Sequence, residues 1–195
     1  MSSSKKTDNH NLPAKLELRR YFLRKYHCIQ ENRPDVLDCC QATGRIWRTL
    51  FEFPLAGYWG VDLKPKKGRL SIDSVKILDQ PGWTQNVVDV DTYGSPWKHW
   101  FALLRNCKHP VTVFLTIGLV KVGGGNYDRA LLAAAGITFE RLKIPNALGS
   151  KVSDLVIKHA LLTPSKHGMR PVEVMEAPNA GNARYLGVRL EPRDS

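Results

Sequence analysis

The chain has 195 residues, of which 43% are hydrophobic; this is enough for one packed core and too short for two ordinary domains. Its 29 lysines and arginines outnumber 18 aspartates and glutamates, giving a net charge of +11, so we expect a polyanionic partner, foremost nucleic acid. The longest nearly apolar stretch, residues 111–120, is about half of a membrane-spanning helix, and no signal-peptide core precedes it, so we expect a cytoplasmic protein with no membrane partner. The four cysteines form no CxxC pair, which favours free thiols, and no histidine and cysteine cluster has metal-ligand spacing.

The N-terminal part of the chain is basic. Residues 1–13 are polar and predict a tail, and apolar and basic residues then alternate at helical spacing from Ala14 to His27. We therefore expect a basic tail and amphipathic helix over residues 1–33 and a folded domain over residues 34–195. Such a helix face is either a solvated surface or a contact for nucleic-acid phosphates. The candidate phosphate contacts are Arg19, Arg20, Arg24 and Lys25.

From Pro34 onward, short apolar runs alternate with helical patterns, which is typical of repeated βα units. The predicted strands are 36–40, 58–63, 70–72, 86–90 and 111–117. The predicted helices are 45–53, 74–78, 96–104, 126–135 and 153–162. Two final β-rich runs, 171–175 and 185–190, flank a segment of proline, asparagine and glycine, which predicts a closing antiparallel hairpin.

Acidic residues stand at the ends of three predicted strands. Asp38 ends the first strand and precedes a turn of small residues that includes Gly44. Asp62 follows about 20 residues later, where a nucleoside-binding sheet places a carboxylate for the ribose hydroxyls. Asp73 stands after the third, short run. One such acid is a helix cap or a solvated side chain, but three predict a shared crevice.

The segment 86–97 is the most informative for chemistry. Strand alternation places Val88 and Val90 on one face and Asp89 and Asp91 on the other. An aromatic residue, Tyr93, comes directly afterwards. A carboxylate beside an aromatic ring suits a planar substrate that bears an amine. The alternative is a capped strand-to-helix turn with the tyrosine in the core.

Three segments resemble motifs of class I S-adenosylmethionine-dependent methyltransferases: DVLDCCQATG, GVDLKP and VVDVDTYGSP. The last is similar to the Asp-Pro-Phe/Tyr-Gly-Ser-Pro signature of the tRNA guanine-N2 dimethyltransferases. The resemblance covers roughly residues 35–122. It implies an α/β, Rossmann-like fold with a seven-stranded, mostly parallel sheet, helices on both faces and a terminal antiparallel hairpin. It also implies S-adenosylmethionine as the cofactor.

The resemblance further implies roles for individual residues. The methionine part of the cofactor would lie at Asp38, Ala42 and Gly44, the ribose at Asp62, and the adenine at Asp73 and Ser74. Asp91 and Tyr93 would face the accepting amine. The substrate contacts that follow from the same motif are Gly94, Ser95, Pro96 and Trp97. The chain departs from the family pattern because Cys40 and Ala42 replace glycines and Thr92 replaces a proline.

We therefore expect an enzyme that methylates an exocyclic amine of a nucleobase, in RNA rather than DNA. An unpaired or flipped base would enter the site. The alternative is a nucleic-acid-binding module that keeps the fold and lacks transfer activity. The absence of G-x-G-x-x-G argues against a third class, NAD-dependent oxidoreductases.

Overall fold

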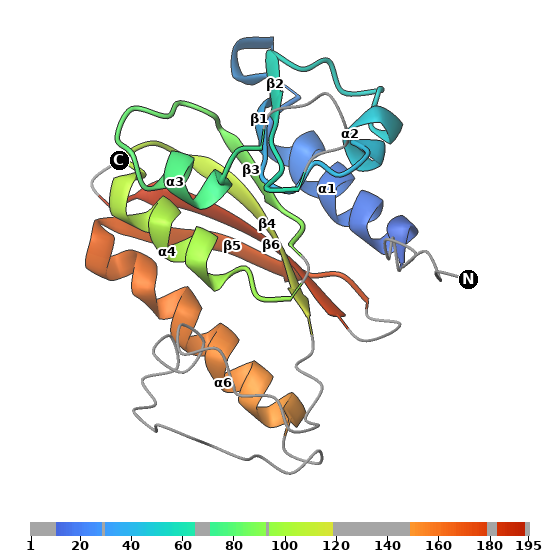
Figure 1. Cartoon of the computed structure of the whole chain (residues 1–195). Coiled ribbons are helices and arrows are strands. Elements are labelled where there is room, and N and C mark those ends of the chain that lie inside the picture. The colour runs from blue at the N-terminus through green and yellow to red at the C-terminus, as the bar shows by residue number, and fades with distance from the viewer. Residues whose placement is uncertain are drawn as a thin grey trace.

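A six-stranded sheet forms the centre of the computed structural model, which describes residues 11–28, 30–64, 71–92, 94–118, 149–178 and 183–193 (Figure 1). The sheet order is β2-β1-β3-β4-β6-β5. Its strands are β1 (Asp35–Asp38), β2 (Gly57–Gly60), β3 (Val87–Val90), β4 (Val111–Gly118), β5 (Met169–Glu176) and β6 (Ala183–Pro192). The first four strands in sequence pair in parallel, whereas β6 pairs antiparallel with both β4 and β5. The expected α/β fold with a terminal antiparallel hairpin is confirmed.

The described residues contain six strands where the resemblance implied seven. The short strand expected over residues 70–72 is the one that fails. Ser71 and Ile72 have no strand conformation, and Ile72 makes a single backbone hydrogen bond to the carbonyl oxygen of Asp62, at 3.0 Å. Residue 70 and the helix expected over 126–135 lie outside the described residues.

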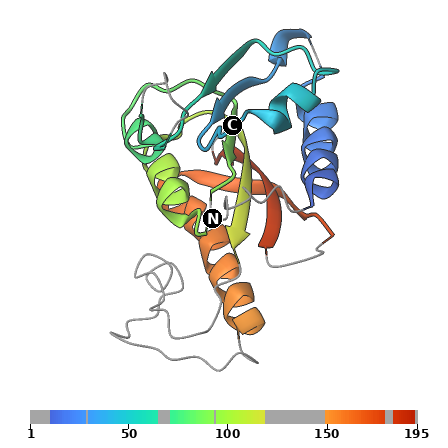
Figure 2. The ribbon, with the colours of Figure 1, turned by 45° about the vertical axis from the view of Figure 1, so that its right-hand side comes forward.

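Helices cover both faces of the sheet. They are α1 (Leu12–Tyr26), α2 (Arg45–Thr49), α3 (Ser74–Leu78), α4 (Trp97–Asn106) and α6 (Gly149–Leu162), with short 3-10 turns at Gln30–Asn32 and Thr163–His167. Figure 2 shows α1 and α4 on opposite sides of the sheet. Within the described ranges, no helix has both the length and the apolar character needed to cross a membrane.

Alternation along the central strands divides the core between these two faces. Val36 and Val87 pack with apolar residues of α1 and α2, whereas Leu37 and Val88 pack with those of α3, α4 and α6. All four valine and leucine side chains are fully buried. Both β1 and β3 are therefore covered on both sides, and the acid Asp89 within β3 is buried together with its apolar neighbours. Helix α1 is thus one wall of the core.

Helix α1 packs closely against β6 and β4 through one aromatic side chain. Phe22 is 0% exposed, and its ring meets that of Phe114 edge-on at 5.8 Å between centroids. On β6 the ring lies over Gly187, where a Cβ atom would collide with it. The small residue at this position therefore lets the helix approach the sheet.

We expect Gly187→Ala to lower the free energy of unfolding by about 1 to 3 kcal/mol, because the added methyl group overfills the space beneath Phe22. Gly57→Ala on β2 is the matched control, since there the atoms nearest to the new Cβ belong to the movable carboxylate of Asp35. Urea denaturation of both variants measures the difference. Equal losses would show that Phe22 can shift aside without cost.

Candidate functional site

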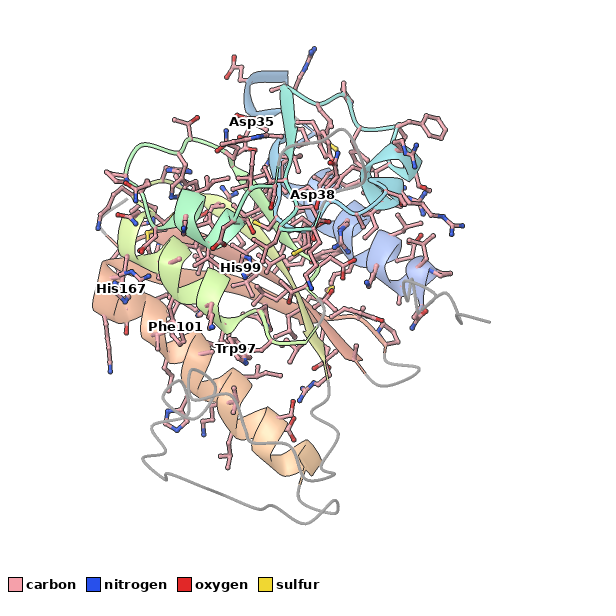
Figure 3. All side chains as sticks on the ribbon, in the orientation of Figure 1. Asp35, Asp38, Trp97, His99, Phe101 and His167 are labelled. Atoms are coloured by element: carbon pink, nitrogen blue, oxygen red, sulfur yellow. The ribbon has the colours of Figure 1, made fainter. Side chains whose placement is uncertain are left out.

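The carboxyl ends of the parallel strands β1, β2 and β3 carry a group of acidic residues. Asp38 is the last residue of β1, and Asp89 and Asp91 lie within and just after β3. Asp62 follows β2. Figure 3 labels both ends of β1, with Asp38 at the end nearer His99 of α4. In open α/β sheets this edge is where ligands bind, and the acids Asp38, Asp62 and Asp91 lie along it.

Asp38 is a buried carboxyl group whose charge is poorly compensated. It is 5% exposed, accepts a hydrogen bond from the hydroxyl of Tyr58 at 2.8 Å, and accepts a long one from the backbone N–H of Cys40 at 3.4 Å. Burial and the nearby charge of Asp89 raise the pKa of Asp38 to about 7, against the opposing effect of Tyr58. This carboxyl group therefore changes its charge near neutral pH.

The loop after β1 is tied to the loop after β2 through Asp62. One carboxylate oxygen of Asp62 accepts a hydrogen bond from the N–H of Ala42 at 3.0 Å, and the other accepts one from the N–H of Lys64 at 2.8 Å. Ala42 has a φ of 43°, in the left-handed region that favours glycine. The loop thus keeps the shape expected of a glycine-containing turn although an alanine occupies the position.

Asp73 and Ser74 lie at the start of α3. The prediction that Asp73 ends a strand is wrong. Asp73 caps α3 instead, by accepting a hydrogen bond from the N–H of Val75 at 3.0 Å. The Ser74 side chain is buried and donates its hydroxyl proton to the carbonyl oxygen of Cys39 at 2.9 Å. Ser74 therefore links α3 to the end of β1 and turns its hydroxyl away from solvent.

The same hydroxyl determines the tautomer of His99. Nε2 of His99 lies 2.8 Å from Oγ of Ser74. Because the hydroxyl proton goes to Cys39, Oγ acts as the acceptor here, which assigns the ring proton to Nε2. Burial lowers the pKa of His99 to about 4, so the ring is neutral. Its Nδ1 is then a buried acceptor without a hydrogen-bond partner in the part of the chain that the structure describes.

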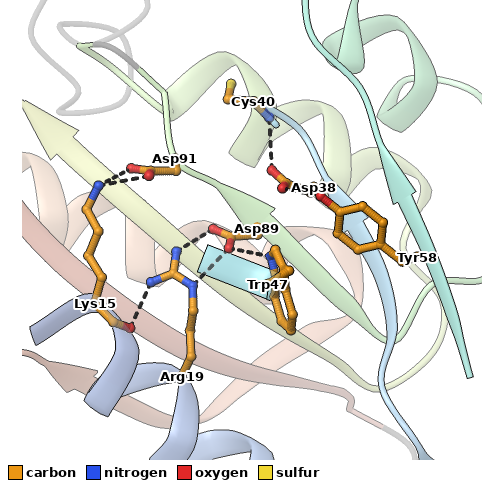
Figure 4. Close-up of polar contacts among 8 residues, drawn as sticks. All are labelled: Lys15, Arg19, Asp38, Cys40, Trp47, Tyr58, Asp89 and Asp91. Carbon is orange, nitrogen blue, oxygen red and sulfur yellow. Dashed lines mark hydrogen bonds and ion pairs between the residues drawn. The ribbon is translucent and has the colours of Figure 1, made fainter. Parts of the chain in front are cut away.

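Asp89 forms a buried ion pair with α1 (Figure 4). Nε and Nη2 of Arg19 donate to its two carboxylate oxygens at 2.8 and 2.6 Å, and the indole N–H of Trp47 donates at 2.9 Å. Arg19 is 2% and Asp89 1% exposed. Burial opposes the charge on Arg19, but Asp89 outweighs it, and the pKa of Arg19 is raised. Asp89 is therefore held by three protein donors and enclosed by them.

Asp91 forms a second pair with α1. Nζ of Lys15 lies 2.6 and 2.8 Å from its two carboxylate oxygens. Burial alone would raise the pKa of Asp91, but the charges of Lys15 and Arg19 and a hydrogen bond with Thr116 lower it below its usual value. Asp91 is thus an ionised acceptor whose side chain remains 17% exposed.

The segment after Asp91 contains several unsatisfied polar atoms. Thr92 Oγ1, Ser95 Oγ and Trp97 Nε1 are buried and lack hydrogen-bond partners within the described ranges. Ser95 does not cap α4, since its Oγ is unpaired and Pro96 occupies the N-cap. The expectation that Trp97 contacts the substrate is wrong, because its side chain is 1% exposed and belongs to the core.

The remaining substrate candidates are placed as follows. Gly94 is exposed with a φ of 113°, and its carbonyl oxygen accepts a hydrogen bond from the N–H of Gly118 at 2.7 Å, which ties the turn to β4. Tyr93 lies outside the described residues. No group of three or more histidine, cysteine, aspartate or glutamate side chains in the described segments has an arrangement that fits a metal ion.

The expected phosphate contacts on α1 need correction. Arg19 is enclosed by its ion pair and cannot reach a phosphate. Arg20 pairs with Glu17 and Glu52, and Lys25 pairs with Glu173. Arg24 is exposed. The basic pattern of this helix is therefore largely compensated within the chain.

Sequence reasoning missed several residues of the site. Three side chains that bind these acids were not among the candidates. Lys15 binds Asp91, Trp47 binds Asp89 and Tyr58 binds Asp38. The sequence contained one indication that basic residues of this helix face the protein. Lys15 and Arg19 are four residues apart, so they lie on the same face of the helix, beside apolar residues of that stretch which pack against the core.

Several solved structures share the fold of this chain, although their sequences are distant from it. No protein-family model matches the sequence, and the search of curated proteins gives no match. Trm1 from Pyrococcus horikoshii, solved with S-adenosyl-L-methionine, is 18% identical with a TM-score of 0.60; the alignment covers 94% of this chain and 56% of that one. The chain thus spans little more than half the length of Trm1.

Two further structures extend the comparison. A Streptococcus thermophilus protein described as a hemolysin is 13% identical over 100% of this chain and 70% of its own, with a TM-score of 0.58. TYW2 of M. jannaschii, solved with AdoMet, is 10% identical over 92% and 76%, with a TM-score of 0.52. At such identities the likeness concerns the fold alone, and it confirms the Rossmann-like α/β fold that the sequence motifs implied, with six described strands in place of seven.

We expect Arg19→Met to lower the free energy of unfolding by about 3 to 5 kcal/mol, because it leaves the buried charge of Asp89 without its cation. Arg24→Met, at an exposed position of the same helix, should change it by less than about 0.5 kcal/mol. Urea denaturation at neutral pH compares them. Similar values for the two variants would mean that the ion pair is not needed for folding.

Proposed function

We propose that this protein is an S-adenosylmethionine-dependent methyltransferase that modifies an exocyclic amine of a nucleobase, in RNA rather than DNA. The observation that carries the proposal is Asp91: an ionised, partly exposed carboxylate at the end of β3, followed directly by a turn with unpaired polar atoms. The TYGSP motif that follows this carboxylate supports the same assignment.

The described residues fit such a cofactor. Asp38 would lie by the ammonium group of the methionine part, beside Ala42 and Gly44 in the same loop. Each carboxylate oxygen of Asp62 makes one hydrogen bond to the backbone and keeps capacity for the ribose hydroxyls. The unpaired Nδ1 of His99 is an acceptor suited to an amino group, such as that of the adenine. Asp73 keeps its second carboxylate oxygen for the same region.

When bound, the cofactor would supply an electrophilic methyl carbon to the amine nitrogen, with the electron pair of the broken carbon–sulfur bond left on sulfur. The chain contributes position and polarity. Asp91 would accept a hydrogen bond from the amine, which turns the nitrogen lone pair toward the methyl carbon. The methylated nitrogen then releases one proton to water. Strong general-base catalysis is not required before transfer.

A nucleic-acid substrate is favoured by the net charge of +11. The compensated charges of α1 leave Arg24 as the exposed candidate for phosphate contact, with weaker contributions from Arg20 and Lys25, whose partners are surface carboxylates. Phosphate contacts of this kind position a substrate without reading its sequence.

A binding module without transfer activity remains the second candidate. One observation favours it: both oxygens of Asp91 contact Lys15, as they also would in an ion pair that only stabilises the fold. The two functions separate in a transfer assay. Cofactor binding without methylation of tRNA, rRNA or DNA would favour the binding module.

We expect Asp91→Asn to reduce single-turnover methyl transfer by on the order of a hundredfold, because the amide is a weaker acceptor than the carboxylate for the amine N–H. The measurement is transfer of a labelled methyl group to bulk tRNA, rRNA and DNA. Asp79→Asn, at an exposed carboxylate paired with Arg105, is the control and should keep the wild-type rate. Full activity of a folded Asp91→Asn protein would remove Asp91 from the reaction.

We expect the affinity for S-adenosylhomocysteine to fall from pH 8 to pH 5.5, by up to about tenfold per unit below pH 7. The ammonium group of this ligand requires an ionised Asp38, whose pKa of about 7 makes it mostly protonated at the acid end. Calorimetry at several pH values measures the slope. Asp38→Asn should bind weakly and without this slope, whereas a flat profile for the wild type would place the ammonium group elsewhere.

A further inference from the structure

Helix α1 presents two cations to two acids of β3, in matching register. Lys15 and Arg19 are four residues apart on the helix, which corresponds to a rise of about 6 Å. Asp89 and Asp91 are two residues apart on an extended chain, which corresponds to about 6.6 Å. The two ion pairs therefore form side by side without distortion of either element (Figure 4).

The two pairs differ in what they leave available. The inner pair is closed, because Arg19 and Trp47 occupy Asp89 and both charged partners are at most 2% exposed. The outer pair is open on one side. The Lys15 side chain is 4% exposed, but the Asp91 side chain is 17% exposed. A carboxylate has about four acceptor positions, so Asp91 retains capacity for a further donor.

Lys15 has few alternatives to this carboxylate. Its ammonium group lies 5.1 Å from the centroid of the Tyr185 ring of β6, which covers it, and its described hydrogen bonds are both to Asp91. Both oxygens of Asp91 lie within 2.8 Å of the same nitrogen. This geometry fixes the plane of the carboxylate at the place where the amine would approach.

We propose that Lys15 is a positioning residue of the transfer site: it holds the Asp91 carboxylate charged and oriented toward the amine, so that α1 is part of the site. This inference rests on the proposed methyltransferase function. Lys15 lies outside the segments that resemble methyltransferase motifs, 76 positions before Asp91 in the sequence.

The charged and polar groups around Asp91 predict how the site responds to loss of Lys15. From α1 it faces Lys15 and Arg19, from β4 Thr116, and from the loop after β1 Cys40; Asp89 lies two residues before it, within β3. Arg19 is already bound to Asp89. Without Lys15, burial becomes the dominant effect and raises the pKa of Asp91. The carboxylate would then become protonated as the pH falls, and transfer would decline with it.

The experiment compares single-turnover methyl transfer by wild type, Lys15→Met and Lys15→Arg between pH 5.5 and 8.5. We expect Lys15→Met to be about tenfold to a hundredfold slower at pH 8 and to lose further activity toward acid pH, relative to wild type. Lys15→Arg, which keeps the charge, should recover most of the rate and the wild-type profile. Lys158→Met, at an exposed lysine of α6, is the control for loss of charge.

Stability and ligand affinity are measured alongside. Each variant should bind S-adenosylhomocysteine within about threefold of wild type, since Lys15 does not touch the loops of Asp38 or Asp62. A folded Lys15→Met protein with the wild-type rate and pH profile would overturn the proposal. So would a uniform loss of rate that Lys15→Arg does not restore.

A readout without catalysis separates this inference from the proposed function. If wild type methylates no substrate, the proposed function fails, and the carboxyl carbon of Asp91 is then titrated by NMR, with Asp91→Asn identifying its signal. We expect a higher pKa for Asp91 in Lys15→Met than in wild type. An unchanged pKa would show that Lys15 does not hold this carboxylate in its charged form.

Discussion

The ion pair between Arg19 and Asp89 joins the first helix to the middle of the sheet. Two charges this far from water are stable only when they neutralise each other and their remaining hydrogen-bond positions are filled. Trp47 donates a further hydrogen bond to Asp89, and the carbonyl oxygen of Lys15 accepts one from Arg19. The pair therefore fixes the position of α1 along the direction of β3, and two other contacts depend on that position. Lys15 reaches Asp91 at the strand end, and Phe22 lies over Gly187.

Much of the fold could be predicted because its signals are local. The central strands are rich in valine and leucine because both of their faces are buried, and in β3 the alternation of Val88 and Asp89 assigned the two faces correctly. The strand expected over residues 70–72 lacked such support. Ile72 is the one apolar residue of its described part, and it is only partly buried. A strand forms only where its backbone can hydrogen-bond to a neighbouring strand, and a short apolar run does not specify that neighbour.

The site was predictable where a strand end determines the position, as for Asp38 and Asp91. It was not predictable where the partner comes from far away in the chain. Helical spacing showed that Arg19 belongs to one face of α1, but it could not distinguish a face that meets water from one that meets buried carboxylates. Lysine and arginine are almost always exposed unless they are paired. A prediction that Arg19 is buried therefore required the knowledge that it pairs with Asp89. The assignment of Arg19 to phosphate contact failed for this reason.

The two acids at the sheet edge have opposite electrostatic surroundings, and this difference separates their roles. Among the described residues, no cation makes a hydrogen bond to Asp38, which lies near Asp89, so burial keeps its pKa high and a cationic ligand would complete its environment. Asp91 already has its cation, so it stays ionised and can accept a hydrogen bond from a neutral amine. Exchanging the two would fail, since an unpaired Asp91 would become protonated and a paired Asp38 would attract no ammonium group. The separation of a binding carboxylate from an orienting carboxylate therefore originates in α1, whose lysine reaches one acid and not the other.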